Sequence, residues 1–130
     1  MTKKIQVGCE MEVTLKMIGG KCKPLILYIL AEEGTLRFGE LMTNIRTVSQ
    51  KTLTNQLREL EADGLILRKA YAEVPLRVEY SLTEKGKSLF PILELMCQWG
   101  EENIDERFEM TSPVVRESKE EKHGNREIIL

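Results

Sequence analysis

The chain has 130 residues, a formal net charge of −2 and a hydrophobic content of 42%, values that are ordinary for one folded domain. The longest apolar run, 25–31, is too short to span a bilayer, and residues 1–10 lack the apolar core of a signal peptide, so we expect a cytoplasmic protein without a membrane partner. One histidine, His123, and three widely spaced cysteines give no zinc-ligand spacing, and we expect neither a metal nor a cofactor. The pI of about 5.6 counts mildly against nucleic-acid binding without excluding it, because the placement of the charges matters more than their sum.

Glycine and proline mark the first two helices. A helix is expected over residues 9–18, because Gly19-Gly20 follow and glycine is the usual residue just past a helix end. Pro24 suits the first position of a second helix, and residues 25–30 are almost uninterrupted apolar. A helix that is apolar nearly all round is predicted to lie buried at the centre of the domain.

Residues 36–82 predict helix, three-residue turn, helix, strand, loop and strand in that order. Ser49 can cap the second of these helices, which Gly64 ends. Alternating apolar and polar residues then predict strands over 65–71 and 77–82, around a proline-containing loop. This order is typical of a winged helix–turn–helix, which places its second helix in the major groove of DNA.

A final long helix is expected to begin after Thr83 and to cover 84–108, with an adjustment at Pro91. From residue 111 onward, charges of both signs are mixed, and we expect a disordered tail over 111–130. The predicted fold class is therefore mainly α (α+β): a winged helix–turn–helix with added helices at both ends, 9–18 and 84–108.

The helix over 49–63 has two different faces. At ~100° per residue, Leu53, Leu57 and Leu60 form an apolar stripe that would pack on the domain. The second face and the helix start carry side chains that can bond base edges or phosphates. The residues assigned to DNA contact here are Ser49, Gln50, Lys51, Thr54, Asn55 and Arg58. The alternative is an ordinary solvated helix face.

The predicted hairpin carries basic residues, and we assign Arg68, Lys69 and Arg77 to phosphate or minor-groove contact. The alternative for these three is edge-strand charge that prevents aggregation.

Several of these segments carry a family resemblance: Gly19–Lys21, Lys23–Leu27, Leu36–Phe38 with Glu40-Leu41, Ser49–Thr54, Leu57–Leu65 and Arg77–Gly86. Their joint occurrence over roughly residues 9–108 resembles the HxlR-type winged helix–turn–helix regulators, relatives of the MarR class. The resemblance implies a DNA-binding domain over 1–110 in a bacterial or archaeal transcriptional regulator, which we expect to be a repressor. It also implies a homodimer, built by 9–18 and 84–108, on a near-palindromic double-stranded operator with recognition helices ~34 Å apart. The chain departs from the family at Cys22, where tryptophan is usual, and at Leu76, where a second proline is common.

Two further expectations depend on this resemblance. Phe90, Met96 and Trp99 are candidate anchors of the dimer interface, because large apolar side chains dominate such contacts; the alternative is a purely intramolecular core. Cys9 lies where several family members sense oxidants, and its oxidation, joined to Cys97 of the partner subunit, is a candidate switch of DNA affinity. The alternative is that all three cysteines are inert packing residues.

Two other classes of function were weighed against DNA binding. A winged helix that binds protein without reading DNA remains the alternative, and the acidic pI favours it slightly. An enzyme is not expected, because the chain contains no phosphate-binding glycine loop, no Cys-x-x-Cys and no histidine outside the tail to pair with a nucleophile.

Overall fold

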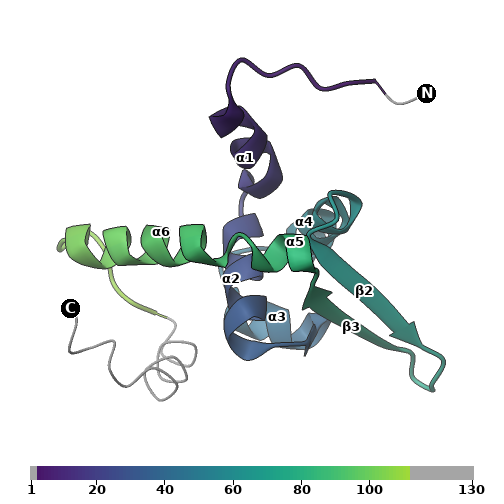
Figure 1. The fold of residues 1–130 in the computed structure, drawn as a ribbon. Helices are drawn as coiled ribbons and strands as arrows, with labels where there is room; N and C mark the ends of the chain where they lie inside the picture. Colours follow the sequence, from purple (N-terminus) through teal and green to yellow (C-terminus); the bar gives the residue numbers. More distant parts are fainter. Residues whose placement is uncertain (1–2, 112–130) are drawn as a thin grey trace.

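The computed structural model describes residues 3–111. In chain order these residues form α1 (Glu10–Ile18), α2 (Lys23–Glu33), β1 (Leu36–Arg37), α3 (Phe38–Asn44), α4 (Gln50–Ala62), β2 (Ile66–Tyr71), β3 (Arg77–Leu82), α5 (Glu84–Lys87) and α6 (Phe90–Asn103). The expected α+β winged helix–turn–helix is confirmed, and Figure 1 shows α2 at its centre, with α1, α6 and the β2–β3 hairpin projecting in three directions. The tail expected over 111–130 lies, beyond its first residue, outside the described part of the chain.

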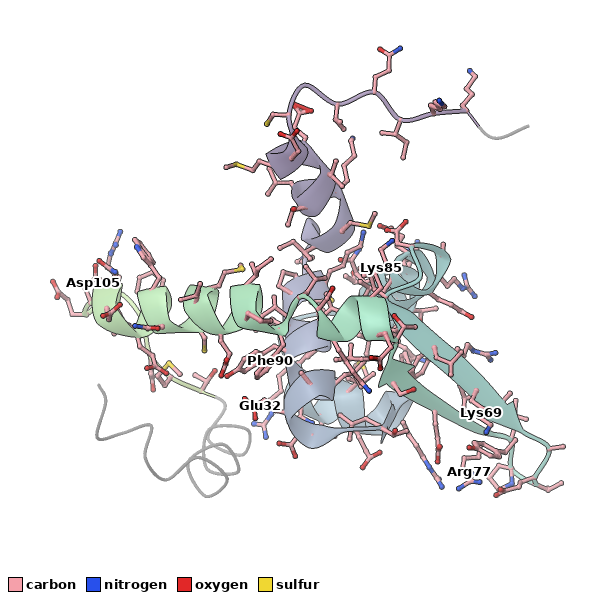
Figure 2. The ribbon with its side chains drawn as sticks, in the orientation of Figure 1. Glu32, Lys69, Arg77, Lys85, Phe90 and Asp105 are labelled. Carbon is pink, nitrogen blue, oxygen red and sulfur yellow. The ribbon has the colours of Figure 1, made fainter. Side chains whose placement is uncertain are left out.

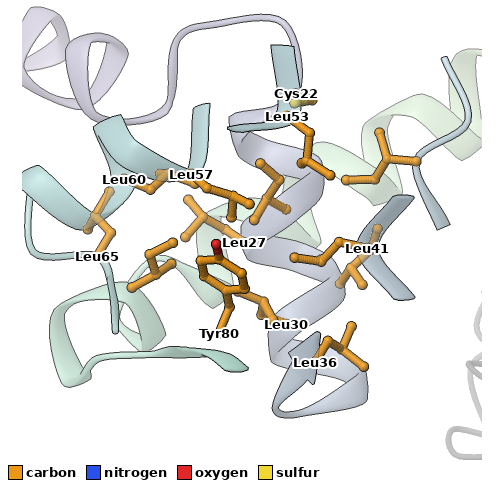
Figure 3. Close-up of a cluster of buried hydrophobic side chains, with 14 of the residues drawn as sticks. Cys22, Leu27, Leu30, Leu36, Leu41, Leu53, Leu57, Leu60, Leu65 and Tyr80 are labelled. Carbon is orange, nitrogen blue, oxygen red and sulfur yellow. The ribbon is translucent and has the colours of Figure 1, made fainter. Parts of the chain in front are cut away.

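The core forms around α2, as its apolar sequence predicts. Pro24 lies in the first turn, where its missing N–H costs no helical hydrogen bond. Ile26, Leu27 and Leu30 are at most 3% exposed, and Figure 3 shows leucines from α3, α4 and β1 around Leu27 and Leu30. One prediction for α2 is incomplete, because Leu25 is 48% exposed and the helix is buried on most of its circumference instead of all of it.

The helix–turn–helix consists of α3 and α4, and its turn is held by local chemistry. The Ser49 hydroxyl accepts a hydrogen bond from the backbone N–H of Thr52 at 3.1 Å, which confirms Ser49 as the N-cap of α4. At the other end Gly64 has φ +74°, a left-handed conformation that glycine adopts without strain. These two residues fix where α4 begins and ends.

The three strands form one antiparallel sheet in the order β1-β3-β2. Sequence periodicity misses β1, because two residues are too few to show alternation; Leu36 pairs with Tyr80 of β3. The β2–β3 pairing runs from Ile66–Leu82 to Tyr71–Arg77. Beyond Ile66 the strand β2 leaves the core, whereas Tyr80 of β3 stays buried in it; the hairpin over residues 66–82 is called the wing below.

The C-terminal helix differs from the single helix expected over 84–108. Thr83 caps a helix as predicted, accepting from the N–H of Gly86 at 3.1 Å, but that helix, α5, ends after one turn. Pro91 cannot donate a hydrogen bond to the preceding turn, so it begins a second helix, α6, in which it occupies the first turn. α6 then ends at Asn103, because Ile104 has extended backbone dihedrals, five residues before the predicted end near Phe108.

The helices at the two ends contribute little to the core. In α1 only Ile18 is buried, and in α6 only Leu93. None of the helices within residues 3–111 combines the length and apolar character that crossing a bilayer demands.

Candidate nucleic-acid interface

The two predicted faces of α4 are separate in the structure. Leu53, Leu57 and Leu60 are at most 2% exposed and face the core. On the outer side a shallow open hollow is lined by the polar face, namely Gln50, Lys51, Thr54, Asn55 and Arg58. The structure therefore gathers all five of these sequence-predicted side chains on one accessible surface, called the α4 face below.

Hydroxyl groups near the start of α4 are partly committed to the helix itself. The Ser49 hydroxyl accepts from the N–H of Thr52 and donates to the Thr52 Oγ1, both at 3.1 Å. The Thr54 hydroxyl donates to the carbonyl of Gln50 at 2.8 Å. Ser49 thus orders the first turn, while Thr54 still offers its lone pairs and methyl group to a ligand.

Charge is sorted along α4. Lys51 and Arg58 lie on the α4 face, and within residues 3–111 neither has a carboxylate within 4.0 Å. The helix N-terminus adds the positive end of its dipole. Glu59 and Glu61 of α4 do not line the α4 face, and Asp63 is the C-cap of the helix. The α4 face is therefore locally basic although the whole chain is slightly acidic.

The wing contains one arginine, Arg77, that is paired with carboxylates, and two exposed cations, Arg68 and Lys69. The Arg77 guanidinium contacts Glu73 at 3.0 Å and Glu79 at 3.4 Å, and its centre lies 4.0 Å from the ring centroid of Tyr71. The Lys69 ammonium lies 5.2 Å from the same ring, and Figure 2 shows both residues near the far end of the wing. Arg68 is exposed and, among the described residues, has no carboxylate partner. Arg77 therefore orders the wing, whereas Arg68 and Lys69 offer charge to a ligand.

Large apolar side chains remain exposed on α1 and α6. Met11 and Leu15 of α1 are 69% and 56% exposed, and Leu95 and Trp99 of α6 are 65% and 67% exposed. Met96 is 48% exposed. Large apolar side chains left exposed in this way are typical of contact sites. We call these side chains the α1/α6 apolar surface.

Phe90 lies apart from that surface. Its ring stacks on Tyr28 of α2, with centroids 6.0 Å apart and an angle of 13° between the planes. Figure 2 shows Phe90 turned toward α2. Of the three candidate interface anchors, Met96 and Trp99 are exposed, and Phe90 packs within its own chain.

The three cysteines have different environments. Cys9 is exposed at the N-cap of α1, and Cys97 of α6 is partly buried. Cys22 is buried, and desolvation raises the pKa of its thiol, which nearby Lys21 opposes more weakly. Within residues 3–111, no group of three or more histidine, cysteine, aspartate or glutamate side chains is arranged to hold a metal ion.

Sequence reasoning missed a set of polar contacts behind the α4 face. Lys23, at the start of α2, is 4% exposed, and its ammonium lies 2.6 Å from a carboxylate oxygen of Glu59. The Gln56 side chain is 9% exposed, and its Oε1 accepts from the backbone N–H of Cys22 at 3.4 Å. The one sequence signal was Gln56 itself, a polar residue between the apolar positions 53, 57 and 60.

A buried central helix, a capped second helix with a polar outer face and a basic hairpin together define a DNA-binding module of the winged helix–turn–helix class. The chain belongs to the HxlR-like helix-turn-helix family, whose model matches residues 17–108. It is therefore a transcriptional regulator of the helix–turn–helix type, in a family of regulators and not of enzymes.

Similar proteins agree with this assignment. An uncharacterized HTH-type transcriptional regulator, BH0655 of Halalkalibacterium halodurans, is 57% identical over 90 residues, which are 69% of this chain and 80% of that protein. The structure of the redox regulator HypR in its oxidized form is 48% identical, with a TM-score of 0.71 over 75% of this chain and 99% of that one. Diamide-treated YodB from B. subtilis is 32% identical, with a TM-score of 0.60 over 77% of this chain and 99% of that one.

Proposed function

We propose that this protein is a homodimeric, sequence-specific repressor that reads a near-palindromic operator with α4 and contacts the flanking DNA backbone with the wing. The observation that carries the proposal is the α4 face: five polar side chains gathered on the outer surface of the second helix of the motif. Glutamine and asparagine can bond adenine through two hydrogen bonds, and arginine or lysine can bond guanine. Such a regulator acts where the genomic DNA is, in the cytoplasm.

The distribution of charge supports DNA over a protein partner. Lys51 and Arg58 on α4, with Arg68 and Lys69 on the wing, are exposed cations, whereas Glu59 and Glu61 of α4 do not line the α4 face. A winged helix that binds only protein has no need for a basic face in this position. Ser49 and Arg77 serve the same interface indirectly, since they order the start of α4 and the wing.

The α1/α6 apolar surface supports a homodimer. Burying a side chain such as Trp99, which is 67% exposed in one chain, is the contribution expected of an interface anchor. A dimer would also present two copies of α4 to successive major grooves. We expect Trp99→Asp to give a monomer in light scattering after size-exclusion chromatography. Leu76→Asp, which changes an equally exposed apolar residue on the wing, should remain dimeric.

We further propose that oxidation of Cys9 modulates DNA binding, through a disulfide with Cys97 of the partner subunit. Two thiols would lose two protons and two electrons to an oxidant such as diamide, which is thereby reduced to the hydrazine. Cys9 is exposed and accessible to such a reagent. Two of the structural relatives, HypR and YodB, are described in oxidized or diamide-treated forms, which supports a test of the same chemistry in this chain.

The experiment is a gel shift on the DNA upstream of the protein's own coding sequence, followed by selection from random DNA, at 50 and 200 mM salt and with or without diamide. We expect a specific shift that salt weakens by orders of magnitude and that diamide reduces in the wild type but not in Cys9→Ser. DNA binding that is equal with and without diamide would contradict the proposed oxidation switch but would leave the proposed DNA-binding regulator intact. If neither DNA pool yields a salt-sensitive complex, the protein-binding alternative replaces DNA reading.

A further inference from the structure

Two polar contacts attach α4 to the joint between α1 and α2. The first is the ion pair between Lys23 and Glu59, with 2.6 Å between nitrogen and oxygen; the lysine side chain is 5% exposed and the glutamate side chain 56%. The second is the hydrogen bond that Gln56 accepts from the backbone N–H of Cys22. Gln56 and Glu59 lie about one turn apart on α4, so the two contacts hold the same side of the helix at successive turns. We call Lys23, Gln56 and Glu59 the α4 clamp.

At the joint between α1 and α2, Gly20 lies directly against the Gln56 side chain of the clamp. Gly20 has φ +144°, and a Cβ atom at this position would overlap the side-chain amide of Gln56. Only glycine combines that backbone conformation with such a close approach. The α1–α2 joint therefore packs directly against Gln56, which is a second reason that α4 has a single favourable position relative to α2.

Because Lys23 is buried, its ammonium group depends on the carboxylate of Glu59 as a partner. An ammonium group removed from water is costly unless a carboxylate or other acceptor stays within reach. Glu59 is the carboxylate that the described residues place within 4.0 Å of Lys23. Any rotation of α4 about its own axis that carries Glu59 away would leave a buried charge unpaired.

The clamp and the α4 face share consecutive residues. Asn55 and Arg58 of the face directly precede Gln56 and Glu59 of the clamp. A rotation of α4 by ~20° would move a side-chain tip ~5 Å from the helix axis by ~1.7 Å. Hydrogen bonds to a base edge tolerate only ~0.5 Å in length. Small rotations that break the clamp would therefore misplace the groups that read bases.

We propose that Lys23, Gln56 and Glu59 are positioning residues that set the rotation of the recognition helix and thereby its discrimination between DNA sequences. This proposal rests on the proposed function, because it assumes that α4 reads DNA. None of the three residues needs to touch DNA. Phosphate contacts, which are less sensitive to rotation and carry no sequence information, would change less than base contacts.

The test compares Glu59→Gln with Glu61→Gln. Both variants remove one negative charge from the exposed C-terminal half of α4, so electrostatics alone would tighten binding of any DNA in both to a similar extent. If the clamp positions α4, Glu59→Gln lowers the ratio of operator affinity to random-DNA affinity by about tenfold or more, the loss expected for a misplaced base contact. Glu61→Gln leaves that ratio unchanged. Lys23→Met, which removes the buried ammonium, should lower the ratio in the same way. Equal ratios in all four proteins would overturn the proposal.

A second measurement without DNA keeps the two proposals distinguishable. Amide hydrogen exchange across residues 50–62 reports how firmly α4 is held. We expect faster exchange in Glu59→Gln and Lys23→Met than in Glu61→Gln, with circular dichroism confirming that all are folded. If the wild type fails to discriminate between DNA sequences, the proposed function falls, and unequal exchange would still support the clamp. Equal exchange would show that the clamp does not hold the helix.

Discussion

We expect the substitution Arg68→Gln to reduce the salt dependence of DNA binding. Arg68 lies on β2 opposite Tyr80, is exposed, and within residues 3–111 has no carboxylate within 4.0 Å. Its charge is therefore available to a DNA phosphate. Arg77, in contrast, already faces Glu73 and Glu79. Removing Arg68 should reduce the number of phosphates that the wing neutralises.

The expected magnitude follows from counterion release. Lys51, Arg58, Arg68 and Lys69 are the exposed cations of the α4 face and the wing, so a dimer offers about eight. At ~0.9 per neutralised phosphate, log K against log salt has a slope of about −7.2, a loss of ~2 × 10⁴-fold in affinity between 50 and 200 mM. Arg68→Gln removes about two contacts per dimer and reduces the slope to about −5.4, a loss of ~2 × 10³-fold.

Fluorescence anisotropy of labelled operator DNA at several salt concentrations measures this slope. Lys87→Gln is the control, because it removes the same charge from a lysine of α5 that is paired with Glu84 at 3.1 Å. A slope change of ~0.9 instead of ~1.8 would indicate that one protomer contacts DNA. An unchanged slope in Arg68→Gln, or an equal change in Lys87→Gln, would refute the assignment of the wing to the DNA backbone.

Three further predictions test the fold and the thiols. Leu27→Ala, at a fully buried position, should lower the free energy of unfolding by ~3 kcal/mol, whereas Leu25→Ala, at a position 48% exposed on the same helix, should cost under ~1 kcal/mol, as measured by urea denaturation. Gly39→Ala should raise stability by ~0.5–1 kcal/mol, because Gly39 lies within α3 and nothing is within 4 Å of the added methyl group; a loss in thermal denaturation would contradict this. Iodoacetamide at pH 8 should modify the exposed Cys9 well before Cys22. Burial excludes the reagent from Cys22 and raises the pKa of its thiol, so that less of the reactive thiolate is present. Equal rates of modification in mass spectrometry would show that the core opens readily.

Local patterns in the sequence were sufficient for most of the secondary structure. The cap at Ser49, the stop at Gly64 and the 3.6-residue spacing of Leu53, Leu57 and Leu60 defined α4 and both of its faces before any tertiary contact was known. These signals are reliable because they act within one turn of helix, so neighbouring residues suffice to express them. The composition of the α4 face was predicted for the same reason.

Other features depended on the tertiary structure, because they arise between residues far apart in the chain. The strand β1 exists only through its pairing with β3, more than 40 positions later in the chain (79 − 37). The packing of Phe90 on Tyr28 likewise required the angle between α2 and α6. Nothing in the local sequence of Lys23 indicates that its charge is buried against Glu59, 36 positions away (59 − 23). The sequence by itself determined which surface of α4 is polar and which is apolar, since helical periodicity is local; only the packing of α2 against α4 decided how that helix is held and which charges remain available at the surface.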